Sequence, residues 1–166
     1  MTLKIIQGLY SFILVFITSL ISKHFTDIGL ENFYETINVS DITPENNYFR
    51  YIWKALYILL FLSFFTILVS KKSVEQFDDA NALFIFQLFL QILWTFSFFY
   101  MGQLLASSIV IVLLVIEAFL MIYVFYPINK WAVLMVFPYL IWIMFASYLN
   151  IYIVFINYAR LESTFA

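Results

Sequence analysis

Cysteine is absent from this chain of 166 residues, which excludes disulfide bonds, thiolate metal sites and a cysteine nucleophile. The single histidine, His24, cannot form a multi-histidine metal site. Charged residues make up 11% of the sequence, against roughly 25% in an average soluble domain. The formal net charge of −2 and the lack of a basic stripe give no electrostatic footprint for nucleic acid. We therefore expect neither a metal site nor a nucleic-acid partner.

Apolar residues make up 65% of the chain and are concentrated in five long segments. The segments cover residues 5–22, 51–70, 81–101, 104–126 and 131–158. Each reaches or approaches the roughly 20 residues that a helix needs to cross about 30 Å of hydrocarbon. Lys54 and Glu117 are the only charged residues inside them. Because barrel strands would alternate apolar and polar residues, the pattern predicts an all-α membrane protein, a bundle of five transmembrane helices.

Three of the four connections between these segments are short, at residues 71–80, 102–103 and 127–130. Short connections make neighbouring helices antiparallel, so we expect an up-down topology in a single membrane domain over residues 1–166. The first short connection also supplies side chains that can cap the third helix. These are Asp78, Asp79 and Asn81.

Residues 23–50 form the one long connection. Its acidic residues alternate with large apolar residues such as Phe33, Tyr34 and Ile37, which a disordered linker would lack. Long loops in compact proteins usually cover or bind something. We predict that this loop folds back over the mouth of the bundle; the alternative is a loosely attached surface loop.

A polar stripe follows one face of the third segment, where Gln87, Gln91 and Thr95 recur at intervals of four. Amides facing lipid would be unpaired, so this face should point into the bundle. Glu117 places a carboxyl group in mid-bilayer, which makes it a functional candidate by default. Counted from the turn at Gly102, Gln91, Glu117 and Gln87 lie about 15, 18 and 21 Å deep. We expect a hydrogen-bonded Gln87/Gln91/Glu117 cluster with a mostly neutral carboxyl; helix association without a ligand role is the alternative.

Aromatic residues make up 22% of the chain, but only four of them are tryptophan. Two helical faces rich in aromatic and small residues could line a pocket, although such faces are also common in an ordinary core. These faces carry Trp53 with Tyr57, and Trp142 with Phe145, Ala146 and Leu149.

One motif near the end of the fifth segment fits a proposed cholesterol-recognition pattern. Val154, Tyr158 and Arg160 have its spacing. The pattern is weak, because a helix rich in valine and tyrosine matches it by chance.

Three blocks of sequence have a recognisable spacing. Residues 137–142 read FPYLIW, and Phe145, Ala146, Leu149 and Asn150 follow them. The third segment carries Ala82-Leu83, Gln87, Gln91, Trp94 and Phe98-Phe99, and the second reads WKALY from Trp53 to Tyr57. These blocks resemble the PYLxW…A…LN, AL…Q…NxxW…FF and WxxLY signatures of the TspO/MBR family, the translocator proteins and tryptophan-rich sensory proteins. The resemblance covers about residues 30–158.

The chain departs from that pattern mainly in its first loop. Where the family reads WxxLxKPxWxPP, residues 33–45 replace both tryptophans, the lysine and two prolines. Gln91 stands where asparagine is usual, Phe96 where proline is usual, and Glu117 where the residue is normally apolar or small. The departures therefore concern the covering loop and the pocket chemistry rather than the fold.

The resemblance implies a five-helix bundle, commonly a homodimer, with a pocket beneath the first loop. Family members bind porphyrins there, and animal members also bind cholesterol and isoquinoline drugs. By position, the ligand-binding candidates are Trp53, Gln91, Trp94, Ala146 and Leu149, with Trp142 nearby. Some bacterial members are reported to degrade protoporphyrin in light, and Trp53 and Trp142 would then be the catalytic candidates. No resident cofactor is expected.

Three functions follow as alternatives. The first is a membrane receptor or sensor that binds a porphyrin or another flat hydrophobic ligand. The second is light-dependent porphyrin degradation, and the third is a carrier or scaffold for lipids or porphyrins. Residue usage that leans toward isoleucine, phenylalanine, asparagine and lysine, with no transit peptide, predicts a bacterial plasma membrane, with the outer mitochondrial membrane as the alternative.

Overall fold

The computed structural model describes residues 2–40 and 42–165, and of residues 46 and 159–165 the backbone alone. Within these residues the chain forms five α-helices: α1 (Thr2–Asn32), α2 (Asn46–Val69), α3 (Val74–Thr95), α4 (Leu104–Phe125) and α5 (Lys130–Phe165). A 3₁₀ helix, η1 (Tyr34–Thr36), precedes α2, and a π-helix, η2 (Phe96–Tyr100), continues α3. All five α-helices are long and apolar enough to cross a membrane. The predicted all-helical bundle of five membrane spans is confirmed.

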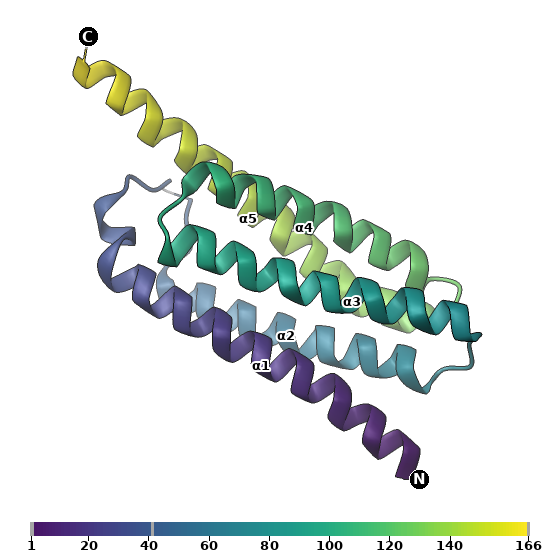
Figure 1. Ribbon diagram of the computed structural model, residues 1–166. Helices are drawn as coiled ribbons and strands as arrows, with labels where there is room; N and C mark the ends of the chain where they lie inside the picture. The colour runs from purple at the N-terminus through teal and green to yellow at the C-terminus, as the bar shows by residue number, and fades with distance from the viewer. Residues whose placement is uncertain (1, 41, 166) are drawn as a thin grey trace.

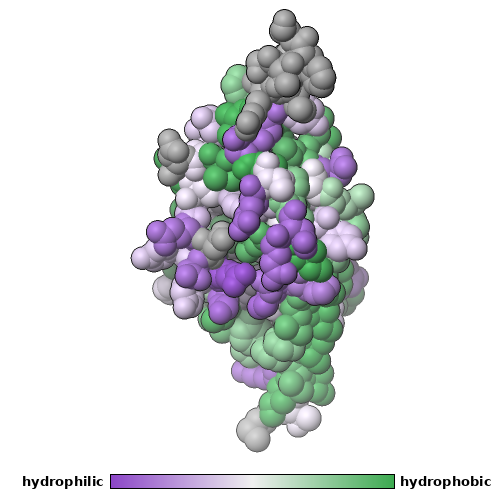
Figure 2. Space-filling view, turned by 90° about the vertical axis from the view of Figure 1, so that its left-hand side faces the viewer, coloured by the Kyte–Doolittle hydropathy of each residue, from purple (hydrophilic) through white to green (hydrophobic). Residues whose placement is uncertain are grey.

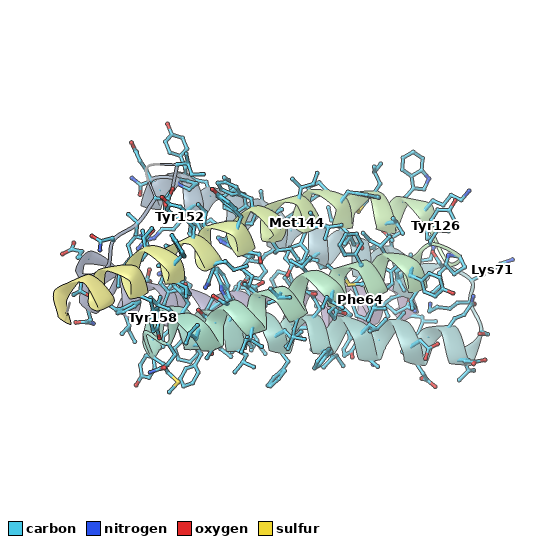
Figure 3. All side chains as sticks on the ribbon, turned by 90° about the horizontal axis from the view of Figure 1, so that it is seen from above. Phe64, Lys71, Tyr126, Met144, Tyr152 and Tyr158 are labelled. Carbon is cyan, nitrogen blue, oxygen red and sulfur yellow. The ribbon has the colours of Figure 1, made fainter. Side chains whose placement is uncertain are left out.

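The helices run up and down, and the two chain ends lie at opposite ends of the bundle (Figure 1). α1 packs against α2 and α3, α5 packs against α2 and α4, and α4 packs against α3. The order around the bundle is therefore α1, α2, α5, α4, α3. We call the end that carries residues 33–45 and 102–103 the loop end. The opposite end, which carries Lys71 and Tyr126, is the turn end (Figure 3).

The turn end is filled by close packing. The rings of Phe64 on α2 and Phe84 on α3 stack with their centroids 3.9 Å apart, and both side chains are fully buried. The hydroxyl of Ser63 donates to the carbonyl oxygen of Ala132 at 2.9 Å and so joins α2 to α5. Contacts of this kind supply most of the association between membrane helices, because lipid offers no hydrophobic driving force.

Lys72 closes the C-terminal end of α2. Its ammonium donates to the carbonyl oxygens of Ile67 and Leu68 at 2.8 Å and to that of Ser70 at 3.1 Å. Burial lowers the pKa of Lys72. The free carbonyls at a helix C-terminus carry partial negative charge, so a cation in this position stabilises the helix end.

The first helix is longer than predicted. It continues past residue 22 to Asn32, so residues 23–32 are helical and the connecting loop is confined to residues 33–45. An ion pair joins Lys23 to Asp27 one turn apart, and the hydroxyl of Thr26 donates to the carbonyl of Ser22 at 2.8 Å. Charged residues end a hydrophobic span without ending a helix, because spacing of three or four residues lets them pair along it.

Gly29 brings this extension of α1 against η2. A Cβ atom at Gly29 would lie 2.4 Å from the Cβ of Phe99 and 2.5 Å from its carbonyl oxygen, so the approach requires glycine. One turn earlier, the ring of Phe25 packs on that of Phe96, with centroids 5.1 Å apart. The extended α1 therefore stands beside the end of α3 and forms one wall of the candidate site.

The predicted cap of the third helix was wrong. α3 begins at Val74, before the predicted cap positions Asp78, Asp79 and Asn81. The N–H of Gln76 donates to Oγ of Ser73 at 3.1 Å, and the N–H of Ser73 donates to Oε1 of Gln76 at 3.0 Å. This reciprocal capping box satisfies two N–H groups that the helix leaves free. The apolar pattern begins later than the helix, which explains the misplaced boundary.

The loop between α1 and α2 lies over the loop end of the bundle, where hydrophilic residues gather on the surface (Figure 2). The rings of Phe33 and Phe98 lie 6.3 Å apart, and those of Tyr34 and Phe99 lie 6.2 Å apart. The side-chain oxygen of Asn157 accepts from the N–H of residue 38 at 3.0 Å, and its amide donates to the carbonyl of the same residue at 2.9 Å. The loop is thus attached to both η2 and α5.

Candidate ligand-binding site

Three tryptophans from three helices meet near the loop end. The ring centroid of Trp53 on α2 lies 5.6 Å from that of Trp94 on α3 and 6.4 Å from that of Trp142 on α5. Phe49 completes the group, with its ring 6.0 Å from both Trp53 and Trp142. We call these four residues the aromatic cluster.

The start of α2 sets this arrangement. Pro44 precedes the helix and holds the chain in an extended form, after which α2 begins at Asn46. Phe49, Trp53 and Tyr57 then follow at intervals of four, so they share one face, and this face points into the bundle. The helical period therefore lines the interior with aromatic rings.

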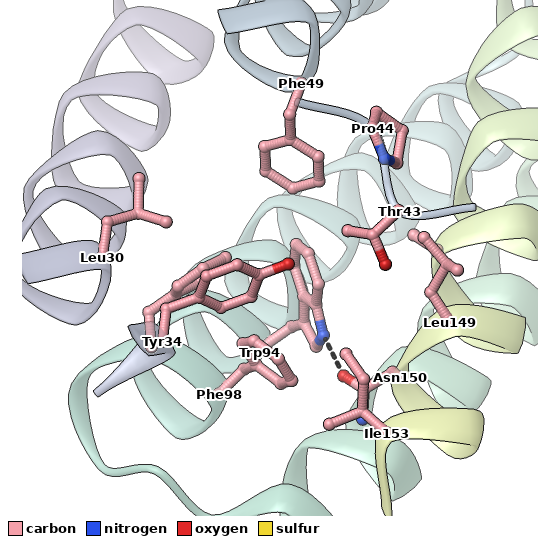
Figure 4. A pocket seen from close by; sticks show the side chains of 12 residues that line it. Leu30, Tyr34, Thr43, Pro44, Phe49, Trp94, Phe98, Leu149, Asn150 and Ile153 are labelled. Carbon is pink, nitrogen blue, oxygen red and sulfur yellow. Dashed lines mark hydrogen bonds between the residues drawn. The ribbon is translucent and has the colours of Figure 1, made fainter. Parts of the chain in front are cut away.

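The three indole N–H groups have different environments. The N–H of Trp94 donates to Oδ1 of Asn150 at 3.0 Å (Figure 4). The N–H groups of Trp53 and Trp142 are buried without a hydrogen-bond partner. A buried unpaired donor costs about 1–3 kcal/mol, so an acceptor atom on a ligand would be stabilised at either position.

The larger cavity near this cluster has a volume of about 220 Å³ and lies between α1, α2 and α3. Its inner wall is formed by Trp53, Tyr57, Gln91, Trp94 and Thr95. The facing wall of α1 carries small hydroxyl side chains, those of Ser19, Ser22 and Thr26. An apolar pocket with a few polar groups that converge on it is the usual form of a small-molecule site.

The rim of the larger cavity is charged. Asp27 of α1 accepts from Nη2 of Arg50 on α2 at 2.9 Å and also pairs with Lys23. Lys54, one turn after Arg50, stands on the same rim. These ion pairs are partly exposed, so their contribution to stability is small, but they place charge at the entrance.

A smaller cavity of about 40 Å³ lies directly beneath the loop (Figure 4). Its lining comes from the loop with η1, from α3 with η2 and from α5, with Leu30 of α1 and Phe49 of α2; it includes Tyr34, Thr43, Phe98, Ala146 and Leu149. Phe49 and Trp94 line both cavities and therefore separate them. Each cavity is smaller than the roughly 300–1,000 Å³ of a typical ligand cleft. A ligand the size of a porphyrin requires movement of the partition.

The predicted polar cluster is organised around Tyr139. Nε2 of Gln87 donates to the hydroxyl of Tyr139, which donates to Oε1 of Gln91 at 3.1 Å. Glu117 is 2% exposed, and neither of its carboxyl oxygens has a hydrogen-bond partner. Glu117 was therefore wrongly expected to bond to the glutamines. The phenol of Tyr139 on α5 instead bridges the two glutamines of α3.

The structure brings most of the predicted ligand-binding residues to the two cavities. Trp53 and Gln91 line the larger, Ala146 and Leu149 line the smaller, and Trp94 lines both. Trp142 lines neither cavity but contacts Phe49 and Trp53, as described above.

The sterol-motif residues lie apart from this group. Val154 is half-buried and Tyr158 is 46% exposed, at the loop end of α5 (Figure 3). The side chain of Arg160 lies outside the described residues. The motif stays a prediction. Among the residues that the structure describes, no three histidine, aspartate or glutamate side chains come close enough to hold a metal ion.

Sequence reasoning did not identify Phe49, Asp27, Arg50, Tyr139 or Asn150 as site residues. Two of them carry a signal that was available, because a tyrosine hydroxyl and an asparagine amide within an apolar span must find partners. Asn150 does so by donating to Oγ of Ser107 and Ser108 on α4, at 3.1 and 2.7 Å. Asp27 and Arg50 were assigned to a loop, so their helical register was not considered.

Comparison with known proteins supports one family. The family model described as "TspO/MBR family" matches residues 11–156. A "Tryptophan-rich protein TspO" of Chlorobaculum tepidum is 34% identical over 125 residues, which cover 75% of this chain and 79% of that protein. A protein of the same description from Archaeoglobus fulgidus is 30% identical over 155 residues, covering 93% and 99%. A "Tryptophan-rich sensory protein" of Cereibacter sphaeroides is 26% identical over 133 residues, covering 80% and 82%.

Proposed function

Because the chain belongs to the TspO/MBR family, we propose that it is a membrane receptor or sensor for a porphyrin or a similar flat hydrophobic ligand. The ligand lies among the helices beneath the first loop, in the space that the two cavities occupy. The observation that carries the proposal is the aromatic cluster, in which the N–H groups of Trp53 and Trp142 are buried and unpaired. Flat aromatic surfaces stack on indoles, and ring nitrogen or carboxylate acceptors pair with indole N–H groups.

Movement of the partition formed by Phe49 is one change that enlarges the space open to a ligand. The Phe49 ring separates a volume of about 220 Å³ from one of about 40 Å³. It belongs to the first turn of α2, next to the loop, and a change of rotamer breaks its contacts with the rings of Trp53, Phe99 and Trp142. Rotation of this ring joins the two cavities into one space bounded by α1, α2, α3 and α5.

Fluorescence titration in the dark tests the proposal. Purified protein in neutral detergent is titrated with protoporphyrin IX, and quenching of tryptophan emission is recorded. Saturable quenching that is weakened in Trp53→Phe and retained in Trp131→Phe supports binding at the cluster, because Trp131 is 70% exposed at the turn end. Quenching that does not saturate, or that is equal in both variants, contradicts it.

Light-dependent porphyrin degradation is the second candidate, and the contacts among the three indole rings favour it. Trp53 contacts both Trp94 and Trp142, and its ring also lies 6.4 Å from that of Tyr139. Such a row of oxidisable rings can supply electrons to an excited macrocycle. Illumination after the titration separates the two functions. Bleaching of the porphyrin that disappears in Trp53→Phe or Trp142→Phe indicates degradation. A pigment that stays intact in the light indicates a receptor.

Location and assembly complete the proposal. We expect the bundle in a bacterial plasma membrane, as a homodimer that associates through lipid-facing side chains. A carrier role for lipids or porphyrins is the third alternative, and an absence of saturable quenching at any ratio favours it.

A further inference from the structure

The rim of the larger cavity carries an excess of positive charge. Lys23, Arg50 and Lys54 line it, and Asp27 is the one acid among the described residues that do so. Asp27 contacts both Lys23 and Arg50, but a single carboxylate neutralises one cation. Two positive charges therefore remain beside an opening into apolar space, where low dielectric strengthens their attraction for an anion.

Lys54 and Arg50 have donors to spare. The ammonium of Lys54 lies 5.4 Å from the ring centroid of Tyr51, and no carboxylate among the described side chains pairs with it. The guanidinium of Arg50 has five N–H donors and uses one of them on Asp27. Its planar fork suits a second carboxylate, which it can bind through two parallel hydrogen bonds.

Below the rim the lining of the cavity changes from charged to aromatic side chains within one helical turn. Trp53 follows Arg50 on α2, and Tyr57 and Trp94 continue the wall inward with aromatic faces. The deepest polar groups are amides and hydroxyls without charge, such as Gln91. Complementarity therefore requires a molecule with an anionic end at the rim and a hydrophobic body inside.

We propose that this rim binds the carboxylate of a lipophilic acid, with Arg50 and Lys54 as its direct partners. The inference rests on the proposed function in placing the hydrophobic body against the aromatic cluster. A porphyrin with propionate groups and a free fatty acid both carry a carboxylate on a hydrophobic body. Arg50 can keep its bond to Asp27 while its spare N–H groups bind the acid, but the negative charge of Asp27 weakens the attraction of the rim for a second carboxylate.

Acids paired with their esters test the proposal. In neutral detergent and in the dark, protein is titrated with protoporphyrin IX and its dimethyl ester, followed by tryptophan quenching. A second pair, cis-parinaric acid and its methyl ester, is followed by the probe's own fluorescence. We expect at least one acid to bind about tenfold more tightly than its ester, because a charge-assisted pair contributes about 1.4 kcal/mol or more.

Two variants are expected to change acid binding in opposite directions. Lys54→Gln removes a cation that pairs with no described carboxylate. It should weaken binding of the acid about fivefold and leave binding of the ester unchanged. Asp27→Asn removes the competing negative charge, so the acid should bind about threefold more tightly, again with no change in binding of the ester. Lys71→Gln is the matched control, since Lys71 lies at the turn end, and it should change neither (Figure 3).

The outcomes distinguish this proposal from the proposed function. Equal binding of protoporphyrin IX and its ester, with no preference for parinaric acid over its ester, overturns the carboxylate site while porphyrin binding stands. Preference for parinaric acid with no binding of either porphyrin upholds the carboxylate site and identifies a fatty acid as the ligand class. If no probe binds, both fail. A loss in Lys54→Gln that is equal for acid and ester also overturns the carboxylate site.

Discussion

The indole N–H of Trp94 donates a hydrogen bond of 3.0 Å to Oδ1 of Asn150, which joins α3 to α5 in the wall of the smaller cavity. The amide nitrogen of Asn150 donates in turn to the hydroxyls of Ser107 and Ser108 on α4. One buried amide therefore connects three helices. It holds one indole of the aromatic cluster fixed while the N–H groups of the other two are unpaired.

Replacing this amide should loosen the loop end. Asn150→Ala leaves the N–H of Trp94 unpaired and removes both hydroxyl contacts, so we expect a loss of about 1–3 kcal/mol in unfolding free energy. Thermal or denaturant unfolding in detergent micelles measures it. Asn32→Ala is the control, because Asn32 is exposed and its amide donates to Ile28 of the same helix. A loss no greater than that of the control would contradict the connecting role of Asn150.

Removing the partition should increase ligand affinity. Phe49→Ala joins the two cavities, and the ligand no longer has to displace a packed ring, so we expect protoporphyrin IX to bind at least about threefold more tightly. Tryptophan quenching in the dark measures the change.

Phe89→Ala provides the control, since Phe89 is 56% exposed on the lipid-facing side of α3 and should leave affinity unchanged. Weaker binding in Phe49→Ala would indicate that this ring stacks on the ligand in its present position, and would contradict its role as a partition.

The sequence predicts the fold well because the bilayer imposes one strong rule. Each apolar run must form a helix that satisfies its own backbone, and short connections such as Gly102-Gln103 make neighbours antiparallel. The same rule does not determine where a helix ends outside the hydrocarbon. For this reason the extension of α1 to Asn32 and the Ser73 cap of α3 were missed, although S-x-x-Q at Ser73 is a recognised start signal.

The site was predicted in part, because helical periodicity identifies inward-facing residues but not their partners. Gln87 and Gln91 face the interior as expected, yet the group between them is Tyr139, which belongs to another helix. Depth along the membrane normal carries no information on the rotation of Glu117 about α4, and its carboxyl oxygens have no hydrogen-bond partner. The cavities depend on how five helices pack together, and no single segment encodes them.

Two glycines of α1 should respond in opposite ways to an added methyl group. Gly29→Ala places Cβ 2.4 Å from the Cβ of Phe99, and since backbone atoms of Phe99 are equally close, relief requires α1 to move. We expect the unfolding free energy of Gly29→Ala to fall by about 1–3 kcal/mol, as in other overpacked cores. Gly8→Ala is the matched control. Its Cβ would lie 3.4 Å from the flexible ring of Phe65, and alanine favours the helix, so stability should be unchanged or slightly higher. Equal unfolding midpoints for both variants would contradict the close approach at Gly29.

The carboxyl group of Glu117 should be neutral in the folded protein. An ionised carboxylate that is 2% exposed and unpaired has neither water nor a donor to stabilise its charge, so the acid form is expected. Infrared difference spectroscopy of wild type against Glu117→Gln at neutral pH should show the carbonyl stretch of a protonated acid. Tyr139→Phe, which alters the neighbouring phenol, should retain that band.

Stability provides a second measurement on the same residue. Even a protonated carboxyl without partners is costly among apolar side chains, so Glu117→Leu should raise the unfolding free energy by about 1 kcal/mol. Leucine keeps the side chain long enough to fill the buried space that Glu117 occupies, whereas Glu117→Ala would leave a void and should lose that gain. Two results together would contradict the neutral acid: a carboxylate band in the wild-type spectrum and a lower unfolding free energy in Glu117→Leu. Glu117 would then be ionised and stabilised by an interaction partner.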